Sequence, residues 1–120
     1  MSFATHTTGR VTVVSLDRVL TYASGVELLE ALEATPENRV HWLLDMSAVT
    51  YIDSAGLGAL IDAYRQIVAR GGALKFLHLQ PRGLHLLTIT GLTGIFESFD
   101  SETAAVASFP QDPRTEMVAV

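Results

Sequence analysis

The stretch that decides the fold is Tyr51-Ile52-Asp53-Ser54-Ala55-Gly56-Leu57-Gly58, which joins an apolar run to an amphipathic one. Residues 40–46, before it, are typical of a strand. After it, apolar side chains recur at helical spacing: Leu57, Leu60, Ile61, Tyr64, Ile67 and Val68. The sequence therefore predicts a strand followed by a helix, with Ser54 at or beside the helix N-cap.

Two glycines follow Ser54 in the first turns of this predicted helix. Glycine inside a helix costs roughly 0.5–1 kcal/mol relative to alanine. Gly56 and Gly58 therefore indicate that something needs close access to the backbone at this point.

Working outward, strands and helices alternate along the chain. Strands are predicted at 11–16, 40–46, 74–79 and 95–99, with a short one at 3–8 before them. Helices are predicted from an N-cap at Ser24, with Glu27 completing a capping box, to Thr35, and then at 54–70, 81–91 and 101–109. This order is typical of an α/β protein whose mostly parallel sheet has right-handed crossovers. Polar residues within the strands (His41, Asp45, Lys75) predict that helices cover one face well and the other partly.

Composition narrows the class of protein. The 120 residues, 48% of them apolar, suffice for one domain, which we place at 1–109 with a loose tail at 110–120. The absence of cysteine excludes disulfides and thiolate metal sites and fits a cytoplasmic protein. Neither a signal peptide nor a membrane-spanning run is visible, so no membrane insertion is expected.

Charge argues against nucleic acid as a direct partner. The net charge is −5, and the eight lysines and arginines are scattered and form no basic stripe. The acids Glu27, Glu30, Glu33 and Glu37 favour a solvated helix face.

The sequence gives little support for a catalytic site or a cofactor-binding site. A serine-hydrolase elbow needs G-x-S-x-G, but Ile52 stands in the first glycine position. The candidate bases, His6, His41, His78 and His85, are typical of surface or core histidines, and their spacing predicts no metal site. Gly56-Leu57-Gly58 lacks the lysine and the spacing of a phosphate loop, so no cofactor is expected.

Ser54 makes better sense as a substrate. A phosphate there would add about −1.5 to −2 charges, and a helix N-terminus tolerates such an anion without unfolding. A partner on this surface would meet the new charge beside Asp53, while the glycines would keep the surface flat. Leu57 is either an outward apolar contact or a core residue, and the pattern leaves both open.

A longer stretch, Leu43 to Leu60, resembles the hallmark of STAS domains, specifically of stand-alone anti-sigma factor antagonists, whose pattern ends in D-S-[SA]-G-[LI]-G. The resemblance covers residues 5–109 and continues through Gly71-Gly72, the 74–79 strand, Pro81 and Thr90-Gly91-Leu92. It implies a STAS fold: a mixed, mostly parallel sheet of four to five strands, the first antiparallel, with helices mainly on one face.

The resemblance also implies a partner switch and no enzyme activity. The unphosphorylated protein would bind an anti-sigma factor serine kinase, the kinase would phosphorylate Ser54 and break the complex, and a PP2C-type phosphatase would restore it. Partner contacts would come from Asp53, Ala55, Gly56, Leu57 and Gly58. A homodimer is left open. Residues 16–22 lack the G-x-L-D-like motif common in the family, so a scaffold role in a stressosome-like or transporter-associated complex is the alternative.

Overall fold

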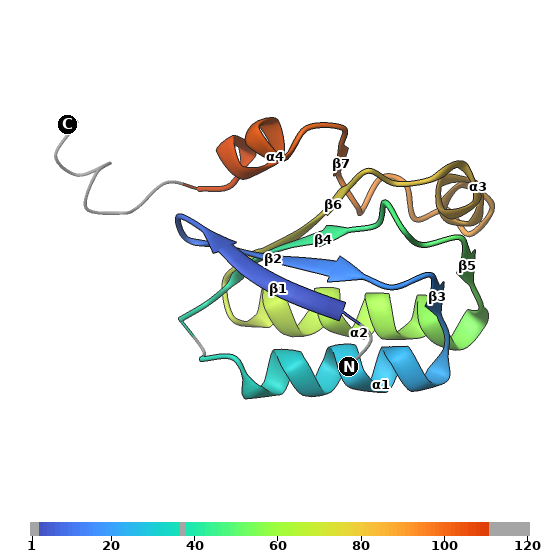
Figure 1. The fold of residues 1–120 in the computed structure, drawn as a ribbon, viewed down its shortest axis with the longest axis horizontal. Helices are drawn as coiled ribbons and strands as arrows, with labels where there is room; N and C mark the ends of the chain where they lie inside the picture. The colour runs from blue at the N-terminus through green and yellow to red at the C-terminus, as the bar shows by residue number, and fades with distance from the viewer. Residues whose placement is uncertain (1–2, 37, 111–120) are drawn as a thin grey trace, which may run out of the picture.

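The computed structural model describes residues 3–36 and 38–110, with the backbone alone at Phe3. Its centre is a five-stranded sheet in the order β1-β2-β4-β6-β7 (Figure 1). The strands are β1 (Phe3–Thr8), β2 (Val11–Leu16), β4 (His41–Asp45), β6 (Ala73–Leu77) and β7 (Ser98–Phe99). β1 runs antiparallel to β2, and every other pair in this sheet is parallel. The expectation of a mixed, mostly parallel sheet with an antiparallel first strand is confirmed.

A small parallel pair, β3 (Val19–Leu20) with β5 (Tyr51–Ile52), lies beyond one end of the main sheet (Figure 1). The described helices are α1 (Tyr22–Ala34), α2 (Ser54–Ala69), α3 (Pro81–Ile89) and α4 (Glu102–Ser108). α1 and α2 lie side by side on one face of the sheet, and α4 lies on the other (Figure 1). α3 lies near the small pair. None of the helices in the described ranges is long and apolar enough to cross a membrane.

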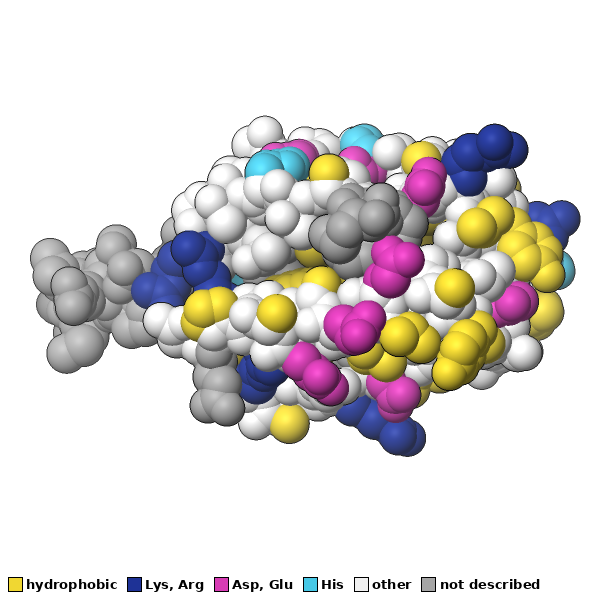
Figure 2. All heavy atoms as spheres, turned by 60° about the horizontal axis from the view of Figure 1, so that its bottom comes forward, with side chains coloured by type: hydrophobic (Ala, Val, Ile, Leu, Met, Phe, Trp, Pro, Cys, Tyr) yellow, Lys and Arg dark blue, Asp and Glu magenta, His cyan; other side chains and the backbone are white. Residues whose placement is uncertain are grey.

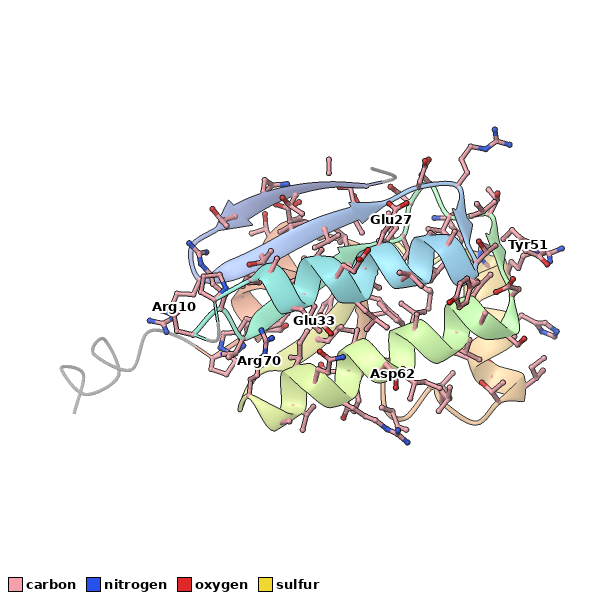
Figure 3. The ribbon with its side chains drawn as sticks, turned by 90° about the horizontal axis from the view of Figure 1, so that it is seen from below. Arg10, Glu27, Glu33, Tyr51, Asp62 and Arg70 are labelled. Atoms are coloured by element: carbon pink, nitrogen blue, oxygen red, sulfur yellow. The ribbon has the colours of Figure 1, made fainter. Side chains whose placement is uncertain are left out.

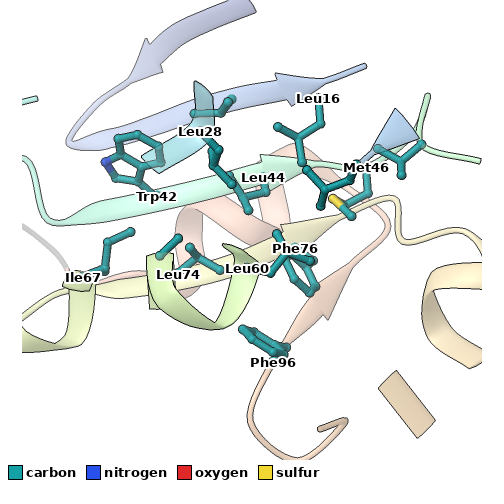
Figure 4. Packing of buried hydrophobic residues seen from close by; sticks show 14 of the residues in the cluster. Leu16, Leu28, Trp42, Leu44, Met46, Leu60, Ile67, Leu74, Phe76 and Phe96 are labelled. Atoms are coloured by element: carbon teal, nitrogen blue, oxygen red, sulfur yellow. The ribbon is translucent and has the colours of Figure 1, made fainter. Parts of the chain in front are cut away.

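Alternation along the strands builds two hydrophobic layers. Trp42, Leu44 and Phe76 point to the α1/α2 side, where they pack with Leu28 and Leu60 in the main core (Figure 4). The intervening strand residues Val11, Val13, Leu43 and Leu77 form a smaller cluster with Ala105 of α4 and its C-cap residue, Phe109. The sheet therefore lies between two hydrophobic layers. From the C-terminal end of β4, the chain continues through a short loop to β5 and then to α2.

Polar strand residues turn out to be covered, not exposed. His41 and Lys75 are each only 8% exposed beneath α4. The Lys75 Nζ donates to the Ser108 carbonyl at 3.1 Å and to its hydroxyl at 3.0 Å, and lies 4.9 Å from the centre of the Phe109 ring. The ammonium group thereby satisfies the Ser108 carbonyl at the C-terminus of α4, where a positive charge is favourable.

The predicted start of the first helix is wrong. α1 begins at Tyr22 with Thr21 as N-cap, one turn before the predicted cap. Ser24 is the third helical residue, and its Oγ accepts a hydrogen bond from the Thr21 N–H at 2.8 Å. Thr21 and Ser24 therefore form a capping box at the start of α1. The S-x-x-E pattern that starts at Ser24 had predicted the capping box one turn too late.

Other boundaries differ by a few residues. β6 ends at Leu77 because His78 has φ 54°, a left-handed conformation that cannot continue a strand. β7 contains only Ser98 and Phe99 of the predicted 95–99 strand. Residues 111–120 lie outside the described residues, so the loose tail stays a prediction.

His41 predicts a specific pH dependence of stability. Burial, and then the positive charges of Arg10 and Lys75, hold the pKa of His41 below its ordinary value of 6.5. Below pH 6.5 the unfolded chain binds a proton at His41 more readily than the folded chain does, so stability falls with pH until the folded pKa is reached. Denaturant unfolding from roughly pH 7 to 5 should show a smaller loss for His41→Leu than for the wild type. His85→Gln, exposed on α3, is the control and should keep the wild-type slope.

Candidate functional site

Ser54 is held by a short strand and a helix cap. β5 pairs with β3, and the Asp53 N–H donates to the Leu20 carbonyl at 3.2 Å. Asp53 then caps α2, its Oδ1 accepting from the Gly56 N–H at 2.8 Å. Ser54 is therefore the first helical residue, directly beside the N-cap as predicted. Its backbone is fixed on both sides.

The Ser54 side chain faces solvent. The residue is exposed, and within the described ranges its hydroxyl makes no hydrogen bond, including to any of the four histidines. A nucleophilic serine needs a base within hydrogen-bond reach. This geometry instead presents a free hydroxyl at a helix N-terminus, where the N–H groups of Ser54 and Ala55 have no intrahelical acceptor.

The two glycines have different roles. Gly56 is buried, and a Cβ there would lie 2.0 Å from the Leu20 carbonyl oxygen. The close access inferred for this region is thus the approach of α2 to β3. Gly58 is exposed, and a Cβ there would have no neighbour within 4 Å. The missing side chain at Gly56 allows α2 to pack against β3. The missing side chain at Gly58 keeps the exposed surface of α2 flat.

The remaining predicted contact residues lie around Ser54 at different depths. Ala55 is exposed, and Asp53 is half-buried. Leu57 is half-buried and packs against the main core, so it has a core role with some surface remaining. Of the predicted set, Ser54, Ala55 and Gly58 form the outward part.

Three large apolar side chains next to Ser54 escaped sequence reasoning. Val19, Tyr22 and Tyr51 are 47%, 73% and 45% exposed. Val19 pairs with Tyr51 across β3 and β5, and Tyr22 begins α1, whose Gly25 lies against Ala59 and the Ala55 carbonyl of α2. We call these three residues the apolar rim. Hydrophobic side chains gather at this end of the molecule (Figure 2).

The signal for Val19 and Tyr22 was present in the segment 16–22, where apolar residues follow Asp17 and Arg18. Their exposure depends on which other elements cover β3, and the local sequence pattern gives no information about that. Exposed acidic residues lie further along the two helices, with Glu33 toward the Arg10 end of α1 and Asp62 in the middle of α2 (Figure 3). A phosphate on Ser54 would add negative charge beside Asp53 and near this apolar surface.

Comparison with known proteins identifies the family. The sequence profile of the STAS domain matches residues 2–105. The anti-sigma-B factor antagonist of Bacillus subtilis (strain 168) is 33% identical over 70 residues, 58% of this chain and 64% of that protein. The alignment thus spans less than two thirds of that relative.

Solved structures share the fold. A candidate anti-sigma factor antagonist from Thermotoga maritima matches with a TM-score of 0.80 at 20% identity, over 88% of this chain and 92% of that one. The murine anion transporter Slc26a9 in its inward-facing state matches with a TM-score of 0.71 at 19% identity, over 85% of this chain but 18% of the transporter. With a profile match that covers most of its length, the chain belongs to the STAS domain family.

Proposed function

We propose that this protein is an anti-sigma factor antagonist that binds an anti-sigma factor kinase and is released when Ser54 is phosphorylated. The observation that carries the proposal is the exposed, unbonded Ser54 hydroxyl at the start of α2, next to the apolar rim. The name of the Bacillus subtilis relative, an anti-sigma-B factor antagonist, supports the same role.

The switch would act on the interface and not on the fold. In the unphosphorylated state, Val19, Tyr22 and Tyr51 can lose water against a partner, and aromatic residues contribute strongly to such contacts. A phosphate would bring a dianion into that contact beside Asp53, and an unpaired charge buried at an interface is costly. The helix N-terminus would meanwhile accommodate the anion.

In this role the protein regulates and does not catalyse. The kinase supplies the phosphoryl group from ATP, which places the exchange in the cytoplasm, and a PP2C-type phosphatase would reverse it. Both the phosphatase and a homodimer remain predictions of the family resemblance.

Phosphorylation at Ser54 is directly testable. With the anti-sigma factor kinase and ATP, the intact mass of the wild type should rise by one phosphate and that of Ser54→Ala should not. Ser47→Ala is the matched control, because Ser47 is exposed in the preceding loop and only its backbone N–H is engaged, by Asp45. Phosphate on the Ser54→Ala protein would contradict the assignment.

A scaffold role is the second candidate, since the same fold forms part of the Slc26a9 transporter. In that case Ser54 would have no regulatory part. If the unphosphorylated and the phosphorylated wild-type protein bind the partner with equal affinity, the scaffold role is favoured.

A further inference from the structure

A hollow of about 250 Å³ lies at the other end of the molecule from Ser54. It is lined by Gly9, Arg10, Asn38, Arg39 and His41, from the turn between β1 and β2 and from the segment that leads into β4. Figure 3 places Arg10 and Tyr51 at opposite ends of α2, a helix of 16 residues and therefore about 24 Å long. The hollow is separate from the apolar rim.

Its lining is rich in hydrogen-bond donors. Two guanidinium groups and one side-chain amide meet there, and none of its described lining residues is acidic. Two arginines therefore line the same hollow in a chain whose net charge is −5. Arginine is the side chain best suited to bidentate contacts with phosphate oxygens.

His41 provides an independent observation. It is 8% exposed and lines the hollow, and its Nδ1 is buried with no hydrogen-bond partner among the described residues. A buried, unpartnered polar atom is rare in folded proteins and calls for an explanation, which can be local strain, a functional role, or a bound water or ion. Positive charge faces His41 from the β1–β2 turn through Arg10 and from β6 through Lys75. The ring of Phe109, the C-cap residue of α4, lies 5.5 Å from the His41 ring.

We propose that this hollow binds a small phosphate-type oxyanion, either inorganic phosphate or the phosphate of a monoester. Arg10 and Arg39 would hold its oxygens, Asn38 would donate from the edge of the hollow, and the His41 ring would lie close to the bound charge. The volume exceeds that of a phosphate ion, so a small organic group fits as well. A second hollow of about 450 Å³, which shares Gly9 and Arg10 and includes Val106 and Phe109, offers apolar surface for that group.

Binding should also act on His41. The same burial and positive charges that lower the pKa of His41 would be offset by a bound anion, so the pKa should rise when the site is filled. This consequence separates binding in the hollow from loose association with surface arginines.

The test is an NMR titration of the full chain with inorganic phosphate and, separately, with phenyl phosphate, at constant ionic strength set with chloride. We expect saturable shifts at Gly9, Arg39 and the His41 ring, a rise in the His41 pKa, and at least a tenfold weaker affinity for Arg39→Gln. Arg82→Gln, exposed on α3, is the matched control and should bind like the wild type.

Tighter binding of phenyl phosphate would identify a monoester as the ligand, and equal or weaker binding would identify inorganic phosphate. Shifts that do not saturate, or that chloride alone reproduces, would overturn the site. So would an unchanged affinity in Arg39→Gln. Because Arg39 is exposed, the backbone spectrum of this variant should otherwise match the wild type and show that its fold is intact.

Discussion

Replacing Gly56 with alanine is expected to destabilise the protein by about 1–3 kcal/mol, the usual cost of forcing an extra carbon into a packed site. The new Cβ would lie 2.0 Å from the Leu20 carbonyl oxygen, which is backbone and cannot rotate away. That carbonyl also accepts the Asp53 N–H, so any shift pulls β3 away from the start of α2. Denaturant unfolding at neutral pH measures the loss.

Gly58→Ala is the matched control two residues further along the same helix. Its Cβ would meet no atom within 4 Å, and alanine is the better helix former by roughly 0.5–1 kcal/mol. Gly58→Ala should therefore stabilise the protein while Gly56→Ala destabilises it. Equal effects of the two changes would refute the close approach of α2 to β3.

These two glycines show what the sequence could and could not predict. Their cost inside a helix was evident from the pattern, and a need for close backbone access followed from it. Which glycine meets that need depends on Leu20, which is 36 positions before Gly56 in the chain. Only the three-dimensional arrangement brings the two together.

The same distinction holds for the fold. α2 was predicted from the helical spacing of the apolar residues on its buried face. β4 was predicted from a short apolar run that is buried on both faces. The strands β3 and β5 have two residues each, too few for any alternation, and they exist because they pair with one another. Thr21 was not predicted as the N-cap because the T-x-x-S pattern from Thr21 overlaps the S-x-x-E pattern from Ser24, which fits a capping box equally well.

For the site, Ser54 and its place at the start of α2 were predicted, and the apolar rim was not. Tyr22 and Tyr51 look like core residues in a linear sequence, since aromatic side chains are usually well buried. In the structure they are 73% and 45% exposed. An exposed apolar cluster beside a modifiable hydroxyl is the combination that an interface switch needs.

Ser54→Asp should weaken binding of the anti-sigma factor kinase by at least about tenfold, or about 1.4 kcal/mol, while leaving the fold intact. The carboxylate would stand beside Asp53 and near the apolar rim, where a docking partner would remove water from it without supplying a paired charge. Within the free protein the same charge is tolerated, because the N-terminus of α2 favours an anion there. Calorimetric titration and thermal unfolding of the same samples separate the two effects.

Thr103→Asp is the control for charge alone, since Thr103 is exposed in the first turn of α4, also near a helix N-terminus but on the other face of the sheet. It should bind the kinase like the wild type. Tyr51→Ser should also weaken binding, without any added charge, because it removes apolar area from the rim. Weak binding in Ser54→Asp together with full binding in Tyr51→Ser would place the contact on another side of Ser54. Loss of the folded spectrum in Ser54→Asp would mean that phosphorylation acts by unfolding the junction and not by changing the surface it presents.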